Sequence, residues 1–128
     1  MKKKIIIIDD EEDFASMLKM RLEASAGYEV MAITEAKDII ERIHIFKPDV
    51  ILLDLLMPGI GGLDACAMLN NDSIGATIPI IVISGLDKST DKLKAFRFGI
   101  TDYLVKPVDD AKLIKTIEKA IKSKSDQP

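Results

Sequence analysis

Residues 4–10 read KIIIIDD, a run of four isoleucines that ends in two aspartates. Consecutive β-branched apolar residues predict a short strand that is buried on both faces. Four later runs have the same character, so five strands are expected, at Lys4–Asp9, Glu29–Thr34, Val50–Asp54, Ile80–Ser84 and Asp102–Val105. Continuous apolar strands of this kind are typical of a parallel sheet that carries helices on both sides.

Between the strands, apolar residues recur at intervals of three and four, which predicts five helices. Gly27, Pro48 and Gly99 are expected to end the first, second and fourth helices, and either Asp109 or Asp110 to begin the fifth. The residues expected on the buried helix faces are, in chain order, Phe14, Met17, Leu18 and Leu22; Ile39, Ile40, Ile43 and Phe46; Leu63, Ala67 and Met68; Leu93 and Phe96, with Ala95 as a further candidate; and Leu113, Ile114, Ile117, Ala120 and Ile121.

Five strand–helix units in 128 residues predict one α/β domain, a doubly wound five-stranded parallel sheet with strand order 2-1-3-4-5. We expect this single domain to occupy residues 1–128, with a core at about 3–122 and a polar C-terminal tail at 123–128. In such sheets, ligands bind at the carboxyl ends of the strands, here where the first and third strands lie side by side.

Composition narrows the class of protein. Hydrophobic residues make up 48% and charged residues 30%, which is the balance of a globular domain. No apolar run approaches the roughly 20 residues that span a bilayer, so no membrane insertion is expected. A single cysteine, Cys66, excludes an internal disulfide and fits the reducing cytoplasm, where we expect the protein to reside.

The net charge of −3 is unevenly distributed. Residues 1–84 hold 8 basic and 14 acidic side chains, whereas residues 85–128 hold 10 basic and 7 acidic ones. The basic residues of the second part are spread along two predicted helices without an arginine cluster or interleaved aromatic residues. This pattern does not favour direct nucleic-acid binding.

Polar residues stand at the predicted carboxyl ends of four strands. The first strand ends in Asp9 and Asp10, and the third ends in Asp54. The fourth ends in Ser84, and the fifth leads into Lys106. Because the first and third strands are neighbours, the three carboxylates are expected to converge and to repel one another. A hard divalent cation relieves this repulsion, and all-oxygen ligands with open water positions predict Mg²⁺.

A carboxylate beside Mg²⁺, a hydroxyl and an ammonium form a site for phosphoryl transfer onto the carboxylate. Asp54 is the candidate nucleophile. We expect Mg²⁺ to hold one phosphoryl oxygen, Lys106 a second, and the Ser84 hydroxyl with a backbone N–H near Leu55 or Gly85 the third. Gly85 also has no side chain that would crowd the incoming group.

Four sequence runs, in order, resemble the receiver domain of two-component response regulators. They are IIIIDDEED at 5–13, VILLDLLMPGIGGLD at 50–64, IPIIVISG at 78–85 and GITDYLVKP at 99–107. The resemblance covers about residues 3–122. It implies the flavodoxin-like (βα)₅ fold of the single-domain chemotaxis regulators, which agrees with the predicted sheet order.

The resemblance implies a role for each matching residue. Asp54 matches the phosphorylated aspartate, Ser84 the switch hydroxyl, Tyr103 the switch aromatic residue and Lys106 the lysine of the site. The metal ligands implied are Asp10 directly, Asp54, Asp9 through water and the backbone carbonyl of Leu56. The Lys106–Pro107 peptide bond is expected to be cis. Ser84, Gly85 and Gly61 depart from the commoner Thr, Ala and acidic residue, but none of them removes a needed functional group.

The resemblance implies a signalling switch and not a turnover enzyme. The phosphoryl group would come from the phosphohistidine of a sensor histidine kinase or of a histidine phosphotransfer protein. Phosphate on Asp54 is expected to draw the Ser84 hydroxyl inward and to let Tyr103 turn from an exposed to a buried rotamer. The signal would leave through the fourth helix, fifth strand and fifth helix, roughly Lys88–Phe98 and Thr101–Lys122, to a downstream protein or a second copy of the chain. Leucines at 56 and 86, where the family often has polar residues that assist water, imply a long-lived phosphoryl group.

Structural interpretations of these residues stay open from the sequence alone. Asp9 and Asp10 are also suited to cap the first helix, Asp54 to form a turn, and Ser84 and Lys106 to be ordinary strand-end residues. Tyr103 is also suited to be a core residue, and Cys66 and Met68 are predicted to be core residues of the third helix. Glu11 and Glu12 are predicted to be acids of the first helical turn, with one of them a candidate neighbour of the metal's water shell. His44 is predicted to be a surface or boundary histidine without a phosphotransfer role.

Other functions of similar folds fit less well. A haloacid-dehalogenase-type phosphatase needs an Asp-x-Asp motif followed by Thr or Val, which residues 9–13 lack. A binder of flavin mononucleotide needs a phosphate loop rich in Ser, Thr or Gly, where this chain has acids. A phosphorylation-independent interaction domain would lack at least one of the four site groups.

Overall fold

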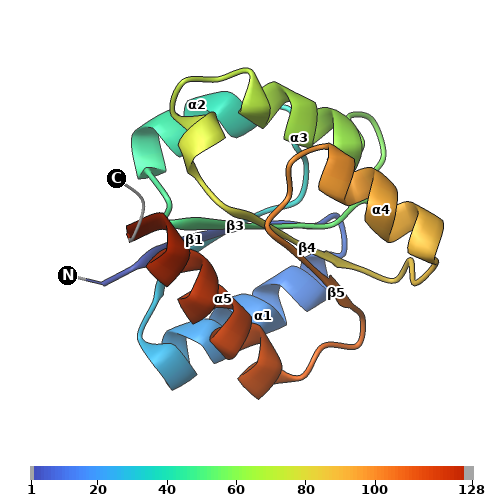
Figure 1. The fold of residues 1–128 in the computed structure, drawn as a ribbon. Coiled ribbons are helices and arrows are strands. Elements are labelled where there is room, and N and C mark those ends of the chain that lie inside the picture. Colours follow the sequence, from blue (N-terminus) through green and yellow to red (C-terminus); the bar gives the residue numbers. More distant parts are fainter. Residues whose placement is uncertain (1, 126–128) are drawn as a thin grey trace.

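Five parallel strands form the centre of the computed structural model, which describes residues 2–125 (Figure 1). Their order in the sheet is β2-β1-β3-β4-β5, which confirms the predicted topology. The first, second and third strands each end one residue earlier than predicted. The bounds are β1 (Lys4–Ile8), β2 (Glu29–Ile33), β3 (Val50–Leu53), β4 (Ile80–Ser84) and β5 (Asp102–Val105).

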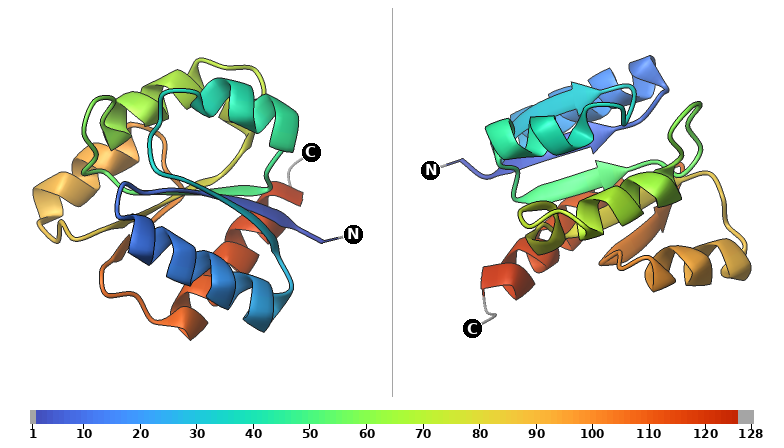
Figure 2. Two further views of the ribbon diagram at one scale, coloured as in Figure 1. Left: turned by 180° about the vertical axis from the view of Figure 1, so that it is seen from behind. Right: turned by 90° about the horizontal axis from the view of Figure 1, so that it is seen from above.

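Helices cover both faces of the sheet, as expected for parallel strands. In Figures 1 and 2, α1 and α5 lie against one face and α2, α3 and α4 against the other. The five predicted helices are confirmed, and a short 3₁₀ helix that the sequence analysis did not predict, η1 (Gly75–Thr77), precedes β4. The helix bounds are α1 (Glu12–Ala26), α2 (Ile39–Phe46), α3 (Gly62–Asn70), α4 (Ser89–Arg97) and α5 (Asp110–Ser125).

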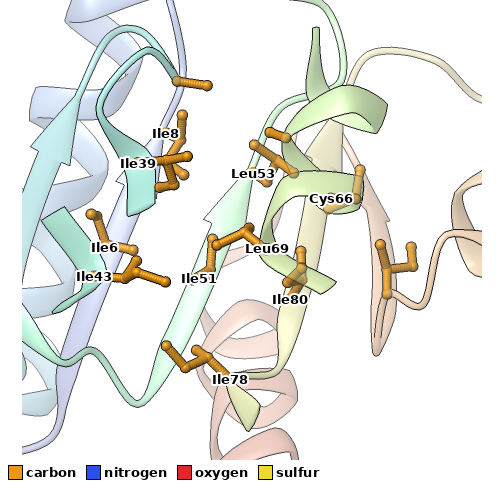
Figure 3. Close-up of a cluster of buried hydrophobic side chains, with 14 of the residues drawn as sticks. Ile6, Ile8, Ile39, Ile43, Ile51, Leu53, Cys66, Leu69, Ile78 and Ile80 are labelled. Carbon is orange, nitrogen blue, oxygen red and sulfur yellow. The ribbon is translucent and has the colours of Figure 1, made fainter. Parts of the chain in front are cut away.

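Two hydrophobic layers follow from the alternation of side chains along each strand. One set of strand residues packs under α2, α3 and α4, and Figure 3 shows part of this layer: Ile6, Ile8, Ile51, Leu53 and Ile80, facing Ile39, Ile43, Cys66 and Leu69. The intervening strand residues pack against α1 and α5: Ile5, Ile7, Val50, Leu52, Ile81 and Ile83. Both faces of β1 and β3 are therefore buried, so the residues that follow these strands start from fixed positions.

The predicted helix ends are confirmed by the backbone. Gly27, with a φ of 68°, ends α1, and Gly99, with a φ of 86°, follows α4. Lys47 adopts the left-handed conformation after α2, just before Pro48. The open choice at α5 is settled as well, because the helix begins at Asp110 while the carboxylate of Asp109 accepts a hydrogen bond from the Lys112 N–H at 3.0 Å.

The predicted buried faces are wrong at one position of α1 and at two of α4. In α1, Met17 is 40% exposed, because the helix contacts the sheet through Ala15, Leu18 and Leu22 and Met17 lies beside that stripe. In α4, Leu93 and Phe96 are 54% and 45% exposed, and the fully buried residue is Ala95, the further candidate. The physical reason is close packing: α4 meets the sheet through a small side chain and turns its larger apolar ones outward. In α3 the prediction is confirmed for Cys66, which is buried with Ala65 and Leu69. The predicted Leu63, Ala67 and Met68 are half-buried, and Leu63 and Met68 pack against the edge of the core.

The C-terminal helix is longer than predicted. Residues 123–125, predicted to belong to a polar tail, form the last turn of α5. Lys122 and Lys124 favour this extension, because basic side chains near a helix C-terminus interact favourably with the helix dipole. Residues 126–128 of the predicted tail lie outside the described residues. Within residues 2–125, no helix has both the length and the apolar character needed to span a bilayer.

Candidate functional site

The carboxyl ends of β1 and β3 bring two aspartates together. Ile8 pairs with Leu53 in the parallel register, so Asp9 and Asp54 follow directly on paired residues. The Asp54 N–H donates to the Ile8 carbonyl at 3.0 Å, and the Asp9 N–H donates to the Ile33 carbonyl at 3.1 Å. The predicted convergence of these two carboxylates at the meeting point of β1 and β3 is therefore confirmed.

Lys106 reaches this pair from the end of β5. Its Nζ lies 2.9 Å from Asp9 Oδ2 and 3.5 Å from Asp54 Oδ2. The Lys106 N–H donates to the Ser84 carbonyl at 2.8 Å, which fixes the start of the β5–α5 connection beside the end of β4. The ring of Phe14, on α1, covers the ammonium, with 4.3 Å between Nζ and the ring centroid. The peptide bond between Lys106 and Pro107 is cis, as predicted.

Glu11 has a contact that its sequence position does not predict. The sequence predicts that Glu11 and Glu12 are acids of the first helical turn, with one of them a candidate neighbour of the metal's water shell. In the structure, Glu11 Oε1 lies 2.6 Å from Lys106 Nζ, the shortest contact of that ammonium. The Glu11 N–H donates to Asp9 Oδ1 at 2.9 Å, so the backbone of the acid run wraps around Asp9. The signal available in the sequence was the spacing of Glu11, two residues after a buried strand-end aspartate.

Burial sets the electrostatics of the two aspartates. Asp9 is 2% exposed and Asp54 is 4% exposed. The pKa of Asp54 is raised above its usual value, chiefly because burial disfavours the charged form. The Leu56 N–H, which donates to Asp54 Oδ1 at 3.3 Å, lowers this pKa. The charge of Asp9 raises it and that of Lys106 lowers it, and the balance leaves Asp54 harder to ionise than a solvated carboxyl.

The same surroundings favour the charged form of Lys106, whereas they disfavour the charged form of Asp54. Burial by itself lowers the pKa of Lys106, because it disfavours the ammonium. Hydrogen bonds to Asp9 and Glu11 and the charges of Asp54 and Asp9 outweigh this effect, so the pKa is raised. The side chain is therefore a fixed positive charge at any physiological pH.

The arrangement of oxygen atoms fits a hard cation. Carboxylate oxygens of Asp9, Glu11 and Asp54 all lie within 4.8 Å of one another. Oxygen-only donors of this kind suit Mg²⁺, and the Lys106 ammonium already places a positive charge in their midst. Asp10, the predicted direct ligand, is exposed and does not belong to this group. Its role and that of the Leu56 carbonyl stay predictions.

The switch candidates Ser84 and Tyr103 meet at Leu86. Ser84 is fully buried, and its Oγ accepts a hydrogen bond from the Leu86 N–H at 3.2 Å. The Tyr103 hydroxyl donates to the Leu86 carbonyl at 2.6 Å, and the residue is 9% exposed. Tyr103 thus occupies the buried position in this structure, because its ring joins the apolar layer while its hydroxyl finds a backbone partner. Burial also raises the pKa of Tyr103.

Two glycines shape the loops around Asp54. A Cβ at Gly62 would lie 2.5 Å from the Leu55 Cα and 2.6 Å from the Asp54 carbonyl oxygen, so only glycine allows α3 to begin this close to the acceptor loop. A Cβ at Gly85 would meet no atom of residues 2–125 within 4 Å other than those of its two chain neighbours. That the site has room for a phosphoryl group here stays a prediction.

His44 is an exposed surface histidine, as predicted. Its Nε2 lies 2.9 Å from both carboxylate oxygens of Asp72, which also accepts hydrogen bonds from the N–H groups of Ile74 and Gly75. Hydrogen bonds from Gly75 and His44 lower the pKa of Asp72. The pair ties α2 to the segment between α3 and η1 and plays no part in the site at the strand ends.

Comparison with known proteins decides the family. The model of the response regulator receiver domain matches residues 5–118. The chain belongs to this family. The receiver domain is therefore the phosphorylation-dependent signalling switch of a two-component system and not a metabolic enzyme, and domains of this family interact with histidine kinases or phosphotransfer proteins.

Individual relatives agree with this assignment. The receiver domain is 38% identical over 114 residues to protein PilH of Pseudomonas aeruginosa, covering 89% of this chain and 93% of PilH. It is 33% identical over 107 residues to the transcriptional regulatory protein PhoP of Bacillus subtilis, covering 84% of this chain but 43% of PhoP. The solved receiver domain of Francisella response regulator 1452 superposes with a TM-score of 0.86 at 27% identity, covering 95% of this chain and 98% of that one.

Burial of Asp54 predicts a gain in stability when its charge is removed. Because its pKa is higher in the folded protein than in the unfolded chain, stability falls as the pH rises from the unfolded pKa through the folded one. At pH 7 the ionised Asp54 therefore destabilises the fold. Asp54→Asn keeps the shape and removes the charge, so without Mg²⁺ it should raise the melting temperature by about 3–5 °C.

The matched control is Glu23→Gln, which removes an exposed charge on α1 and should leave the melting temperature unchanged. Scanning calorimetry at pH 7 measures both variants. A melting temperature for Asp54→Asn at or below that of the unmodified protein would contradict the electrostatic account of the site.

Proposed function

We propose that residues 1–128 act as one cytoplasmic receiver domain that accepts a phosphoryl group on Asp54 from the phosphohistidine of a sensor histidine kinase or a histidine phosphotransfer protein. The observation that carries this proposal is the placement of the buried Asp54 carboxylate. It lies 3.5 Å from the Lys106 ammonium, and the hydroxyl of Ser84 comes from the adjacent strand.

Each group has a separate part in the transfer. An Asp54 carboxylate oxygen forms a bond to phosphorus while the phosphorus–nitrogen bond of the donor breaks, and the imidazole nitrogen keeps the bonding electron pair. Lys106 and the Ser84 hydroxyl bind two of the phosphoryl oxygens, and these contacts neutralise charge and fix geometry. Leu56 and Leu86 carry no polar group to orient an attacking water, which supports slow hydrolysis of the product.

The oxygen-rich group at the strand ends supports a magnesium site within this proposal. Asp10 and Asp54 would hold the ion directly with the Leu56 carbonyl, and Asp9 would hold it through water. When bound, Mg²⁺ supplies positive charge that offsets the repulsion between the carboxylates and the phosphoryl oxygens.

The first test of the function uses acetyl phosphate with Mg²⁺ as a small donor. The intact protein should gain one phosphoryl group, a mass increase of about 80 Da. Asp54→Asn should abolish the gain, because the amide keeps the shape of the side chain and loses its nucleophilic charge. Mass spectrometry of the whole protein measures both, and undiminished labelling of the Asp54→Asn variant would reject the proposal.

The metal assignment has its own test in calorimetric titration with Mg²⁺. Asp10→Ala should weaken Mg²⁺ binding more than Asp9→Ala, because Asp10 is proposed to touch the ion and Asp9 to act through water. Loss of a direct carboxylate ligand should cost tenfold or more in affinity, on the order of the effect of removing metal-site partners. Equal affinities in the two variants, or a greater loss in Asp9→Ala, would contradict this assignment.

We propose that the signal leaves through α4, β5 and α5. A phosphoryl group on Asp54 would draw the Ser84 hydroxyl inward. The predicted turn of Tyr103 from an exposed to a buried rotamer needs correction, because Tyr103 is already buried in this structure. We propose instead that phosphorylation stabilises this buried position. Lys92 lies beside Tyr103, with Nζ 6.0 Å from the ring centroid, and links the switch residue to the surface of α4. That surface also exposes Leu93 and Phe96, so a partner could bind these apolar side chains among the basic residues of α4. An acidic partner protein or a second copy joined by Lys–Asp pairs fits this face.

Amide hydrogen exchange with and without beryllofluoride, a phosphoryl mimic, tests this route. Protection should increase in residues 88–98 and 101–122, because the mimic stabilises one arrangement of Ser84 and Tyr103. The Asp54→Asn variant should show no such change and is the control for non-specific effects. Changes confined to α2 and α3, with no change in residues 101–122, would refute the proposed route through α4, β5 and α5. Such a result would not affect the assignment of Asp54 as the phosphorylation site.

A further inference from the structure

Glu11 is the nearest partner of the Lys106 ammonium. Nζ lies 2.6 Å from Glu11 Oε1, 2.9 Å from Asp9 Oδ2 and 3.5 Å from Asp54 Oδ2. In this structure, therefore, the group proposed to bind a phosphoryl oxygen lies closer to Glu11 than to the acceptor carboxylate. A phosphoryl group on Asp54 would have to compete with Glu11 for the same ammonium.

The local backbone directs Glu11 to this contact. Glu11 is the N-cap residue of α1, with extended backbone angles, and its carbonyl accepts the Ala15 N–H at 2.9 Å. A carboxylate at this position usually accepts a hydrogen bond from an N–H of the first helical turn. Within the described residues the Glu11 side chain makes no such bond, and its carboxylate meets Lys106 instead. Asp9 holds the Glu11 N–H at 2.9 Å, which fixes the base of the side chain.

Exposure distinguishes Glu11 from the other two partners. The Glu11 side chain is 63% exposed, whereas those of Asp9 and Asp54 are 3% and 4% exposed. The exposed Glu11 carboxylate is hydrated whether or not it contacts Lys106, so breaking this ion pair costs little free energy. A released Asp9 would stay buried and charged, which is costly. Glu11 is therefore the partner that Lys106 can give up.

We propose that Glu11 is a positioning residue that holds the Lys106 ammonium in the unphosphorylated domain and yields it to the phosphoryl group on Asp54. The proposal rests on the proposed function of Asp54. The contact stabilises only the unphosphorylated state, so it opposes phosphorylation by the free energy of that contact. Loss of the contact should make the phosphorylated state easier to reach.

Beryllofluoride binding at saturating Mg²⁺, measured by calorimetry, tests the proposal. Glu11→Gln should bind the mimic roughly two- to fivefold more tightly than the unmodified protein, the effect of losing a largely exposed ion pair. The matched control is Glu12→Gln, which removes an equal charge one residue along. Glu12 is exposed and has no ion pair within the described residues, so its affinity should not change. Equal affinities for Glu11→Gln and Glu12→Gln overturn the proposal.

A third variant separates the contact from the charge. Glu11→Asp keeps the charge but shortens the side chain by one methylene, so it should lose the 2.6 Å contact and bind beryllofluoride as tightly as Glu11→Gln. If Glu11→Asp behaves like the unmodified protein while Glu11→Gln binds more tightly, simple charge repulsion is at work and the positioning role is wrong.

Two further readouts do not depend on phosphorylation. The ¹⁵N resonance of Lys106 Nζ in the protein without metal should shift in Glu11→Gln and stay in place in Glu12→Gln. Titration with Mg²⁺ alone should give similar affinities for these two variants, because Glu11, although its carboxylate lies near those of Asp9 and Asp54, is paired with Lys106 and is not one of the proposed magnesium ligands. A large loss of Mg²⁺ affinity in Glu11→Gln only would make Glu11 a metal ligand and overturn the proposal.

Failure of the inference can be told apart from failure of the proposed function. If the unmodified protein does not bind beryllofluoride, both the function of Asp54 and this inference are rejected. If it binds normally and Glu11→Gln has no effect, only the inference is rejected.

Discussion

The ammonium of Lys106 lies among the carboxylates of Asp9, Glu11 and Asp54, and the site depends on this arrangement. Two of these carboxylates are almost fully buried, where an unpaired charge is costly. Lys106 offsets that cost, and its own raised pKa keeps it charged. The Lys106 ammonium stabilises the buried carboxylates in the unphosphorylated protein, and the same ammonium would bind a phosphoryl group on Asp54. The stability of the site and its proposed function therefore depend on the same charge.

The sheet supplies the rigidity that this interaction requires. β1 and β3 are adjacent, parallel and buried on both faces, so the backbone positions of Asp9 and Asp54 follow from strand register. Gly62 allows α3 to approach the loop after Asp54, and the N–H of Leu56 meets one oxygen of that carboxylate. The charged side chains therefore lie on loops that are held by the strands on one side and by α3 on the other.

The sequence predicts correctly the features that follow from sheet topology alone. The apolar runs set the strands, and the strand order then brought Asp9, Asp54 and Lys106 to one edge of the sheet. It failed where side-chain packing decides. The outward turn of Leu93 and Phe96 depends on how closely α4 approaches the sheet through Ala95, and helical spacing carries no information on that distance. The pairing of Glu11 with Lys106 depends on the rotamer of an N-cap residue, and the buried position of Tyr103 depends on a partner at Leu86.

The central claim is that Asp54 is the residue that receives the phosphoryl group, and chemical mapping tests it most directly. Borohydride reduces an aspartyl phosphate to homoserine, so treatment of the phosphorylated protein followed by tandem mass spectrometry locates the modified residue. The account predicts homoserine at position 54 and unmodified aspartate at positions 9 and 10. Homoserine at either of those positions, or a phosphorylated protein without homoserine at position 54, would contradict it.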